Sequence, residues 1–226
     1  MNGPLMPLMI VTLAALFGSI PFGLLIARAW SGADVRTVGS GNIGATNVLR
    51  ASGPAPAILT LLLDIAKGAG AVLIARAAMV GAHSQIVASG TLATEGMRGG
   101  LLAAPGLEAW AALAAVTGHM FSPWLRFRGG KGVATAAGAV LALSPALAAS
   151  GFAVFLIVFA MTRTVSLASI SACLAVIVVS GAGLIPDGPS FLIVAGICAL
   201  IVFRHRANLS RLLKGQEPKL HMRRNR

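Results

Sequence analysis

The sequence is poor in charged side chains, above all in acids, and it contains no tyrosine. Of its 226 residues, 11% are charged and 57% are hydrophobic, with six Asp or Glu against eighteen Lys or Arg. An ordinary soluble domain has about one quarter charged residues, and so few polar side chains cannot cover a water-soluble core. The mean hydropathy of +0.86 also indicates a largely apolar chain. The composition therefore predicts an integral membrane protein.

The shortage of aromatic residues also decides how the net charge of +12 is interpreted. Proteins that bind single-stranded nucleic acid place stacking aromatic side chains among basic ones. Here the 5% of aromatic residues are scattered, and no basic stripe contains them. We therefore expect no nucleic-acid partner and interpret the charge as a determinant of orientation in the membrane.

Cysteine and clustered acids are also scarce. Cys173 and Cys198 lie in apolar runs and not in a CxxC pair, so neither a disulfide framework nor a structural zinc site is indicated. The six acids form no HExxH or paired pattern, and we expect no metal. No basic residue precedes the first apolar run, which favours a retained helix over a cleaved signal peptide.

Apolar runs follow one another along the chain, each close to the about 20 residues that cross a bilayer. They cover residues 5–27, 54–75, roughly 106–125, 133–161, 165–184 and 190–203. The run over 133–161 is too long for one span and contains Ser144-Pro145 and Ser150-Gly151, so we divide it into two. The prediction is an all-α, polytopic bundle of seven transmembrane helices in one domain, with six helices as the alternative.

The basic residues lie on one side of this series of spans. Residues 28–50, 126–131, 163 and 204–226 hold fifteen of the eighteen Lys and Arg. Seven spans place all these segments on the same side, and Lys and Arg accumulate on the cytoplasmic side of membrane proteins. We therefore expect an external N-terminus, a cytoplasmic C-terminal basic tail over 204–226 and an external loop over 76–105.

Four polar segments lie at the predicted cytoplasmic face, and the first is SGNIGATNVLR at 40–50. Its glycines let backbone N–H groups turn towards a ligand, its short polar side chains add donors, and Arg50 can hold an anion through two hydrogen bonds. A helix N-cap in an ordinary loop is the alternative explanation. Besides Arg50, the candidate ligand-binding residues are Ser40, Gly41, Asn42, Gly44, Thr46 and Asn47.

The second segment contains Gly129-Gly130-Lys131-Gly132, which precedes a predicted helix. A lysine beside the free N–H groups of a helix N-terminus forms an anion site. The segment is not a Walker A loop, because Gly and not Ser or Thr follows Lys131. A basic loop facing anionic lipid is the alternative, and it explains the nearby arginines better than the glycines.

The other two segments have simpler alternative explanations. Ser166 and Ser169 of TVSLAS share one helix face, where a helix cap is favoured over a ligand role. The segment from Arg204 to Glu217 is basic and contains leucines, as an amphipathic anchor at the membrane surface would.

Asp64 and Lys67 lie inside an apolar run, three residues apart. A lone charge at the centre of a membrane helix costs about 2.5 to 3.5 kcal/mol on insertion scales. We therefore expect the two to pair, either for function or as an internal structural link.

Familiar catalytic patterns are missing. No His is followed by Asp five residues later, which excludes an HxxxxD acyltransferase, and there is no GxSxG. Within the four segments, His205 and His119 are the candidate bases. A phosphate oxygen of a substrate is the alternative proton acceptor.

Taken together, the segments resemble the acyl-phosphate-dependent glycerol-3-phosphate acyltransferases, the PlsY-type bacterial family. The matching stretches are SGNIGATNVLR at 40–50, LLLDIAKG at 61–68, GHMFSPWLRFRGGKGVAT at 118–135, TVSLAS at 164–169 and HRANLSRLLKGQE at 205–217. The resemblance implies a multi-pass enzyme of the bacterial inner membrane that needs no cofactor. It would transfer a fatty acyl group from acyl phosphate to the 1-hydroxyl of sn-glycerol 3-phosphate, giving lysophosphatidic acid and phosphate. Membrane lipid and the enzyme that produces acyl phosphate are further candidate partners.

The resemblance also implies residue roles. The residues implied to be catalytic are Ser40, Arg50, Lys131, His205 and Asn208. The glycines around Lys131 would hold the glycerol phosphate, Ser169 would help to hold acyl phosphate with Ser166 beside it, and Glu217 would be structural. The stretch Ser122-Pro123-Trp124 and the long loop over 76–105 depart from the family pattern.

Two other function classes remain open at this point. Glycine-broken helices and basic sites also build transporters or channels for phosphorylated anions. Transporter sites usually lie near the midplane, however, whereas these segments lie at one face. A lipid-binding scaffold without catalysis explains the basic tail but not residues 40–50.

Overall fold

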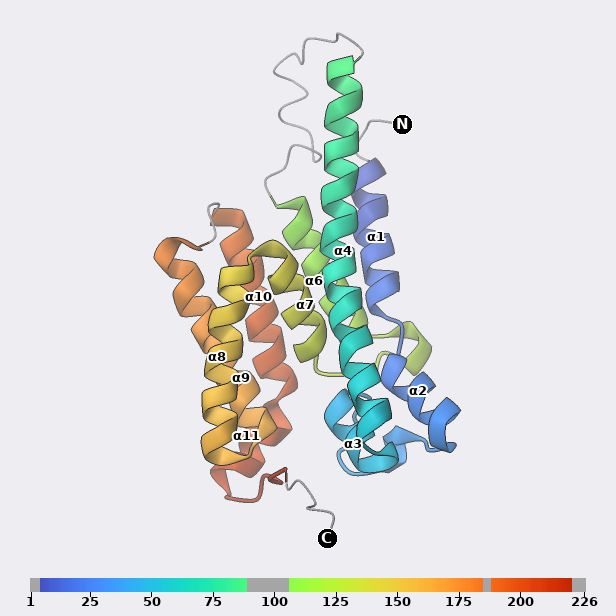
Figure 1. Ribbon diagram of the computed structural model, residues 1–226, viewed down its shortest axis with the longest axis vertical. Helices are drawn as coiled ribbons and strands as arrows, with labels where there is room; N and C mark the ends of the chain where they lie inside the picture. The colour runs from blue at the N-terminus through green and yellow to red at the C-terminus, as the bar shows by residue number, and fades with distance from the viewer. Residues whose placement is uncertain (1–4, 89–105, 185–187, 221–226) are drawn as a thin grey trace.

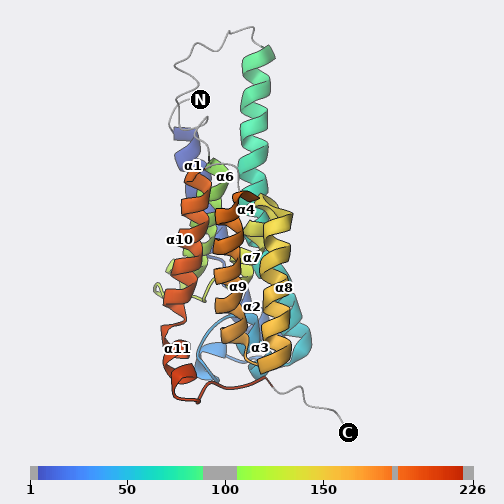
Figure 2. The same cartoon turned by 90° about the vertical axis from the view of Figure 1, so that its left-hand side faces the viewer.

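The chain is an elongated bundle of helices (Figures 1 and 2). The structure is a computed structural model that describes residues 5–88, 106–184 and 188–220. Within these ranges every regular element is a helix, as predicted. The end of the bundle that carries α2, α3 and α11 is called the α11 end below; α4 extends furthest in the opposite direction (Figure 1).

The helices in chain order have the following bounds. They are α1 (Leu5–Gly18), α2 (Phe22–Ser31), the 3₁₀ turn η1 (Val35–Thr37), α3 (Ala45–Ser52), α4 (Pro54–Ala88), α6 (Leu107–Met120), the 3₁₀ turn η2 (Pro123–Leu125), α7 (Val133–Leu143), α8 (Pro145–Thr162), α9 (Val165–Val179), the π-helical turn η3 (Ser180–Leu184), α10 (Gly188–Arg204) and α11 (Arg206–Leu213).

Several of these helices are long and apolar enough to cross a membrane. In the described part of the chain there are four such stretches: Leu5–Ser31, Pro54–Gly81, Pro145–Thr162 and Val165–Gly183. A fifth results if α10 and α11, which meet at 57°, are counted as one broken span. The integral membrane bundle is confirmed, whereas seven spans and the orientation of the two ends stay predictions.

One predicted boundary is confirmed and three differ. The run over 133–161 divides at Ser144, whose Oγ accepts the N–H of the third residue of α8 over 3.3 Å. The first apolar stretch is not one continuous helix: it is interrupted between α1 and α2 just before Pro21, which has no N–H for a helical hydrogen bond. The helix expected over 106–125 ends at Met120, and α4 continues to Ala88, so the first part of the predicted loop over 76–105 is helical. Residues 89–105 lie outside the described residues.

Glycines bring the central helices into backbone contact. A Cβ on Gly68 of α4 or on Gly138 of α7 would lie 1.9 Å from a carbonyl oxygen of the other helix, and Gly18 and Gly118 form the same reciprocal contact between α1 and α6 at 2.1 Å. Helices in lipid associate mainly through such close packing, because lipid is as apolar as their side chains. These contacts make α1, α4, α6 and α7 a closely packed frame.

The frame also supports the polar segments at the α11 end. Val35, Ile43 and Val48, from the chain between α2 and α4, are buried in one apolar cluster with residues of α2 and α4. Leu125 of η2 joins the same cluster. The polar loop between α2 and α3 is therefore anchored by apolar side chains on both of its flanks.

The glycine contact between α4 and α7 gives a test of this packing. Gly138→Ala should lower the free energy of unfolding of the purified protein in detergent by about 1–3 kcal/mol, the usual cost of overpacking a close contact. Gly196→Ala in α10 is the matched control, because a Cβ there meets nothing within 4 Å, and alanine favours a helix by roughly 0.5–1 kcal/mol. Equal stability of the two variants would contradict the contact.

Candidate anion-binding site

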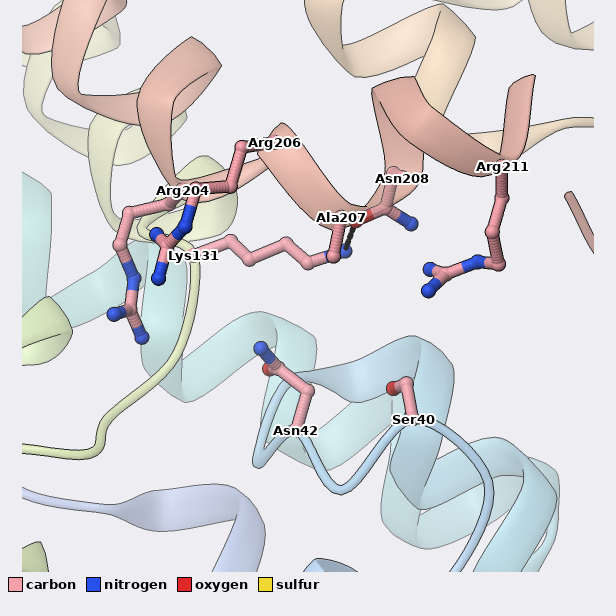
Figure 3. A pocket seen from close by; sticks show the side chains of 8 residues that line it. All are labelled: Ser40, Asn42, Lys131, Arg204, Arg206, Ala207, Asn208 and Arg211. Carbon is pink, nitrogen blue, oxygen red and sulfur yellow. Dashed lines mark hydrogen bonds between the residues drawn. The ribbon is translucent and has the colours of Figure 1, made fainter. Parts of the chain in front are cut away.

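A pocket of about 240 Å³ opens at the α11 end (Figure 3). Three of the four polar segments supply its lining, which consists of Ser40, Asn42, Lys131, Arg204, Arg206, Ala207, Asn208 and Arg211. Four of these eight side chains are cationic and none is acidic. In Figure 3 the loop with Ser40 and Asn42 faces the basic side chains across the cavity. Such a lining selects for anions.

Asn47 folds the loop that carries Ser40 and Asn42. Its buried amide donates to two main-chain carbonyls within residues 35–38, over 2.7 and 3.0 Å, and its Oδ1 accepts the N–H of Ser40 over 3.2 Å. The Asn42 side chain accepts the N–H of Gly44 over 2.9 Å. The Asn47 amide is therefore used within the protein, while Ser40 and Asn42 reach the pocket.

Residues Gly129 and Gly130, which precede Lys131 in the chain, are held on two sides. Their N–H groups donate to carbonyls at the end of α6, both over 3.1 Å. Their own carbonyl oxygens accept from Nη2 of Arg204, over 2.8 and 3.1 Å. Gly132 then adopts a left-handed φ of 82° as the cap before α7, and the first N–H groups of a helix attract anions. Lys131 lies between these two features.

A chain of hydrogen bonds orients Lys131. Its Nζ donates to Oδ1 of Asn208 over 2.7 Å, and the Asn208 amide donates to Oε1 of Glu217 over 2.5 Å. Glu217 also accepts from Ser166 over 2.7 Å and from Nε of Arg211 over 2.8 Å. Glu217 thus fixes two pocket-lining side chains at once.

The surrounding charge acts directly on Lys131. Burial lowers the pKa of Lys131 to about 8; Glu217 opposes this shift, whereas Arg211, Arg50 and Arg204 add to it. The pocket therefore holds its lysine close to losing its proton at neutral pH. A bound anion would stabilise the charged form and raise this pKa again.

Glu217 keeps its negative charge in the same surroundings. Burial raises the pKa of Glu217, but hydrogen bonds from Asn208, Ser166 and Arg211 outweigh this and leave the pKa below its ordinary value. The carboxylate therefore remains a permanent partner of the cationic side chains near the pocket.

His205 is buried at the junction of α10 and α11 and does not line the pocket. Its Nδ1 lies 2.8 Å from the carbonyl oxygen of Ile201, which can only accept, so the proton is on Nδ1. Burial, followed by the charge of Lys131, lowers the pKa of His205 to about 4. His205 is therefore neutral at neutral pH and a weak base.

The other residues predicted for the site lie at varying distances from the pocket. Arg50 is exposed near the end of α3, and its positive charge contributes to the lowered pKa of Lys131. Ser169 is buried and donates to the carbonyl of Val165 in its own helix over 2.8 Å. Gly41, Gly44 and Thr46 belong to the loop and the first turn of α3 without lining the pocket. Asp64 and Lys67 form the expected pair, at 2.8 Å, inside the bundle.

The arginines of the fourth segment were not predicted to line a pocket. Arg204, Arg206 and Arg211 were grouped with a basic membrane anchor, although all three line the cavity. Asp34 was not predicted either; its carboxylate accepts from Arg36 over 2.6 Å and from Arg28 over 2.9 Å beside the loop. The hydrogen bonds from Arg36, followed by the bond from Arg28, hold the pKa of Asp34 well below its usual range.

The same chain is similar to a family of known proteins over nearly its whole length. A family profile described as glycerol-3-phosphate acyltransferase matches residues 8–215. Glycerol-3-phosphate acyltransferases of Synechococcus elongatus and Thermus thermophilus are 44% and 45% identical, over 95% and 92% of this chain and 94% and 92% of theirs.

Solved structures show the same similarity. The crystal structure of PlsY (YgiH), an integral membrane glycerol 3-phosphate acyltransferase in its glycerol 3-phosphate form, has a TM-score of 0.79 and 39% identity, over 95% of this chain and 96% of that one. Its lysophosphatidic acid form has a TM-score of 0.77, with 38% identity over 95% of each chain.

Proposed function

The chain belongs to the glycerol-3-phosphate acyltransferase family, and we propose that it transfers a fatty acyl group from acyl phosphate to the 1-hydroxyl of sn-glycerol 3-phosphate. The products would be 1-acyl-glycerol 3-phosphate, which is lysophosphatidic acid, and inorganic phosphate. The observation that carries this proposal is the pocket with four cationic and no acidic lining side chains at one end of an apolar bundle. Both substrates carry a phosphate, and one also carries a chain that dissolves in the bilayer.

The charge of the pocket fits two phosphates better than one. A phosphate monoester carries a charge of about −1.5 to −2 at neutral pH, so a single one leaves about half of the four lining cations without a counter-ion. Glu217 pairs with Arg211, while Arg50 adds one further positive charge close by. The balance therefore still favours two phosphate groups in the pocket together.

The two sides of the pocket, the loop with Ser40 and Asn42 and the basic side chains opposite, suggest where each phosphate binds. Lys131 and the N–H groups at the start of α7 would hold the glycerol phosphate, as the anion site predicted from Gly129-Gly130-Lys131-Gly132. The acyl phosphate would then lie between Arg211 and the loop with Ser40 and Asn42, which face each other across the cavity (Figure 3). The Ser169 hydroxyl is not used in this arrangement, because it already bonds to its own helix.

The reaction needs one bond to form and one to break. The oxygen of the glycerol 1-hydroxyl bonds to the acyl carbonyl carbon, and the bond from that carbon to the phosphate oxygen breaks, with its electron pair leaving on phosphate. The hydroxyl proton must go to a base. His205 is outside the pocket and has a pKa of about 4, so a phosphate oxygen of a substrate is the better acceptor.

The protein would therefore act mainly by alignment and charge. Holding two reactants in line can supply roughly 7–11 kcal/mol of a barrier in favourable cases. Lys131 and the arginines would stabilise the negative charge that collects on the departing phosphate. A transporter is less well supported, because most pocket residues belong to the loop before α3 and to α11 at one end of the bundle (Figure 1), whereas transporter sites lie near the midplane.

We further propose that the α11 end faces the cytoplasm of a bacterial inner membrane, with the N-terminus outside. This orientation is based on the fifteen basic residues that share one side of the predicted spans. A single cysteine introduced at position 220 should be protected from an impermeant thiol reagent in intact cells, in a variant with Cys173 and Cys198 replaced, and one at position 90 should react. Labelling at position 220 from outside would contradict the orientation.

The choice of donor is the sharpest test of the proposed chemistry. Purified protein in detergent, with chelator present, should acylate glycerol 3-phosphate from palmitoyl phosphate and release one phosphate per acyl group transferred. Palmitoyl coenzyme A should give little product, because it has no phosphate next to the carbonyl for the pocket to hold. Lys131→Met is the control for a site-dependent reaction and should lose most activity. Equal use of the thioester, or loss of all activity with chelator, would contradict the proposal.

A further inference from the structure

A second cluster of polar side chains is buried between α4 and α6. Asp64, Lys67 and His119 are only 2%, 0% and 3% exposed. Lys67 Nζ lies 2.8 Å from Asp64 Oδ1, 2.8 Å from His119 Nδ1 and 2.9 Å from the carbonyl oxygen of Ile20. The ammonium group therefore forms hydrogen bonds to His119 Nδ1 and to the Ile20 carbonyl oxygen, and an ion pair with Asp64.

This arrangement fixes the state of the His119 ring. Because the Lys67 ammonium donates to Nδ1, the imidazole is neutral and carries its proton on Nε2. That edge of the ring lies against Gly130, where a Cβ would be 2.0 Å from Nε2 and within 2.9 Å of both neighbouring ring carbons. The His119 main-chain carbonyl also accepts the Gly130 N–H over 3.1 Å. His119 thus contacts the loop through both its backbone and its side chain.

We infer that Lys67 and His119 are positioning residues that hold Gly129–Gly132, the anion loop, in the conformation that binds phosphate. The inference rests on the proposed function, in which this loop holds the glycerol phosphate. His119 supports Gly130 from inside the bundle, while Arg204 holds the carbonyl oxygens of the same two glycines. A Gly-Gly segment has exceptional backbone freedom, and a loop that must be ordered on binding loses affinity.

A purely structural ion pair would not need this third member. Asp64 alone can neutralise Lys67, and the two belong to the same helix at i, i+3. The ring of His119 adds nothing to that charge balance, but it occupies the space that a side chain at position 130 would need. The Lys67 hydrogen bond keeps the ring in this orientation and so links α4 to the anion loop.

A size-exchange experiment tests the contact. Gly130→Ala should raise the KM for glycerol 3-phosphate at least about tenfold, because its Cβ displaces the loop from the ring. His119→Ala should raise this KM less. In both variants kcat should stay within about twofold of wild type. In the double variant the shortened side chain makes room for the new Cβ. Its KM should therefore return to within about threefold of that of His119→Ala, as expected for coupled neighbours.

Two further variants separate positioning from stabilisation. His119→Asn keeps an acceptor for Lys67 but withdraws from Gly130, so its KM should rise as in His119→Ala while its thermal stability stays near wild type. Thr60→Val is the matched control: Thr60 is buried in α4 and bonds only to the carbonyl of Pro56 in its own helix. Its KM should be unchanged.

Lys67 has its own test, because an intact ion pair is not required for folding. Asp64→Leu with Lys67→Met replaces the pair by apolar side chains, a change that is often neutral or stabilising. The double variant should fold, yet its KM should rise because nothing fixes the ring of His119. A wild-type KM in this variant would contradict the role of Lys67.

The outcomes distinguish this inference from the proposed function. Wild-type protein that does not acylate glycerol 3-phosphate would contradict the proposed function. An active wild type whose Gly130→Ala defect is not relieved by His119→Ala would overturn the inference. If Gly130→Ala does not fold, a wild-type KM in His119→Asn overturns it equally, and a raised KM with unchanged kcat supports it.

Discussion

Repulsion between like charges is the constraint on which this site depends. Lys131, Arg204, Arg206 and Arg211 line one cavity without an acidic side chain among its lining residues. Burial, and after it the charges of Arg211, Arg50 and Arg204, lower the pKa of Lys131 to about 8. Such a cluster persists only if the surrounding structure prevents the side chains from moving apart. Because a bound anion reduces the repulsion between them, the cluster binds anions.

The rest of the structure supplies that restraint at two levels. Glycine contacts between α4 and α7, and between α1 and α6, give a closely packed apolar frame. Polar groups then hold the cationic side chains in place. Glu217 accepts hydrogen bonds from Asn208 and Arg211, and the carbonyl oxygens of the anion loop accept from Arg204. The polar network at the α11 end is thus ordered by the close packing of the helices that carry it.

The sequence predicts this site better than it predicts the roles within it. Polar, glycine-rich segments stand out in an apolar chain, and the positive-inside rule places them together, so the location of the site can be predicted. The division at Ser144-Pro145 is also local, because Ser is a good N-cap and Pro a good first residue. Asn47 was expected to bind ligand, but its amide bonds to residues 35–38 and Ser40 instead. Arg204 was overlooked because its acceptors lie more than seventy residues away in the chain.

The most direct test of the account is whether a phosphate anion relieves the repulsion between the cationic side chains of the pocket. Thermal unfolding of the purified protein should be measured with glycerol 3-phosphate, with glycerol and with chloride at matched ionic strength, since a ligand that binds only the folded state stabilises it. The account predicts saturable stabilisation by glycerol 3-phosphate alone. Its apparent affinity should fall as pH rises through the pKa of Lys131, about 8, where the phosphate itself stays dianionic because it titrates near pH 6. Lys131→Met should remove most of the effect and its pH dependence. Equal stabilisation by glycerol, or none by glycerol 3-phosphate, would contradict the account.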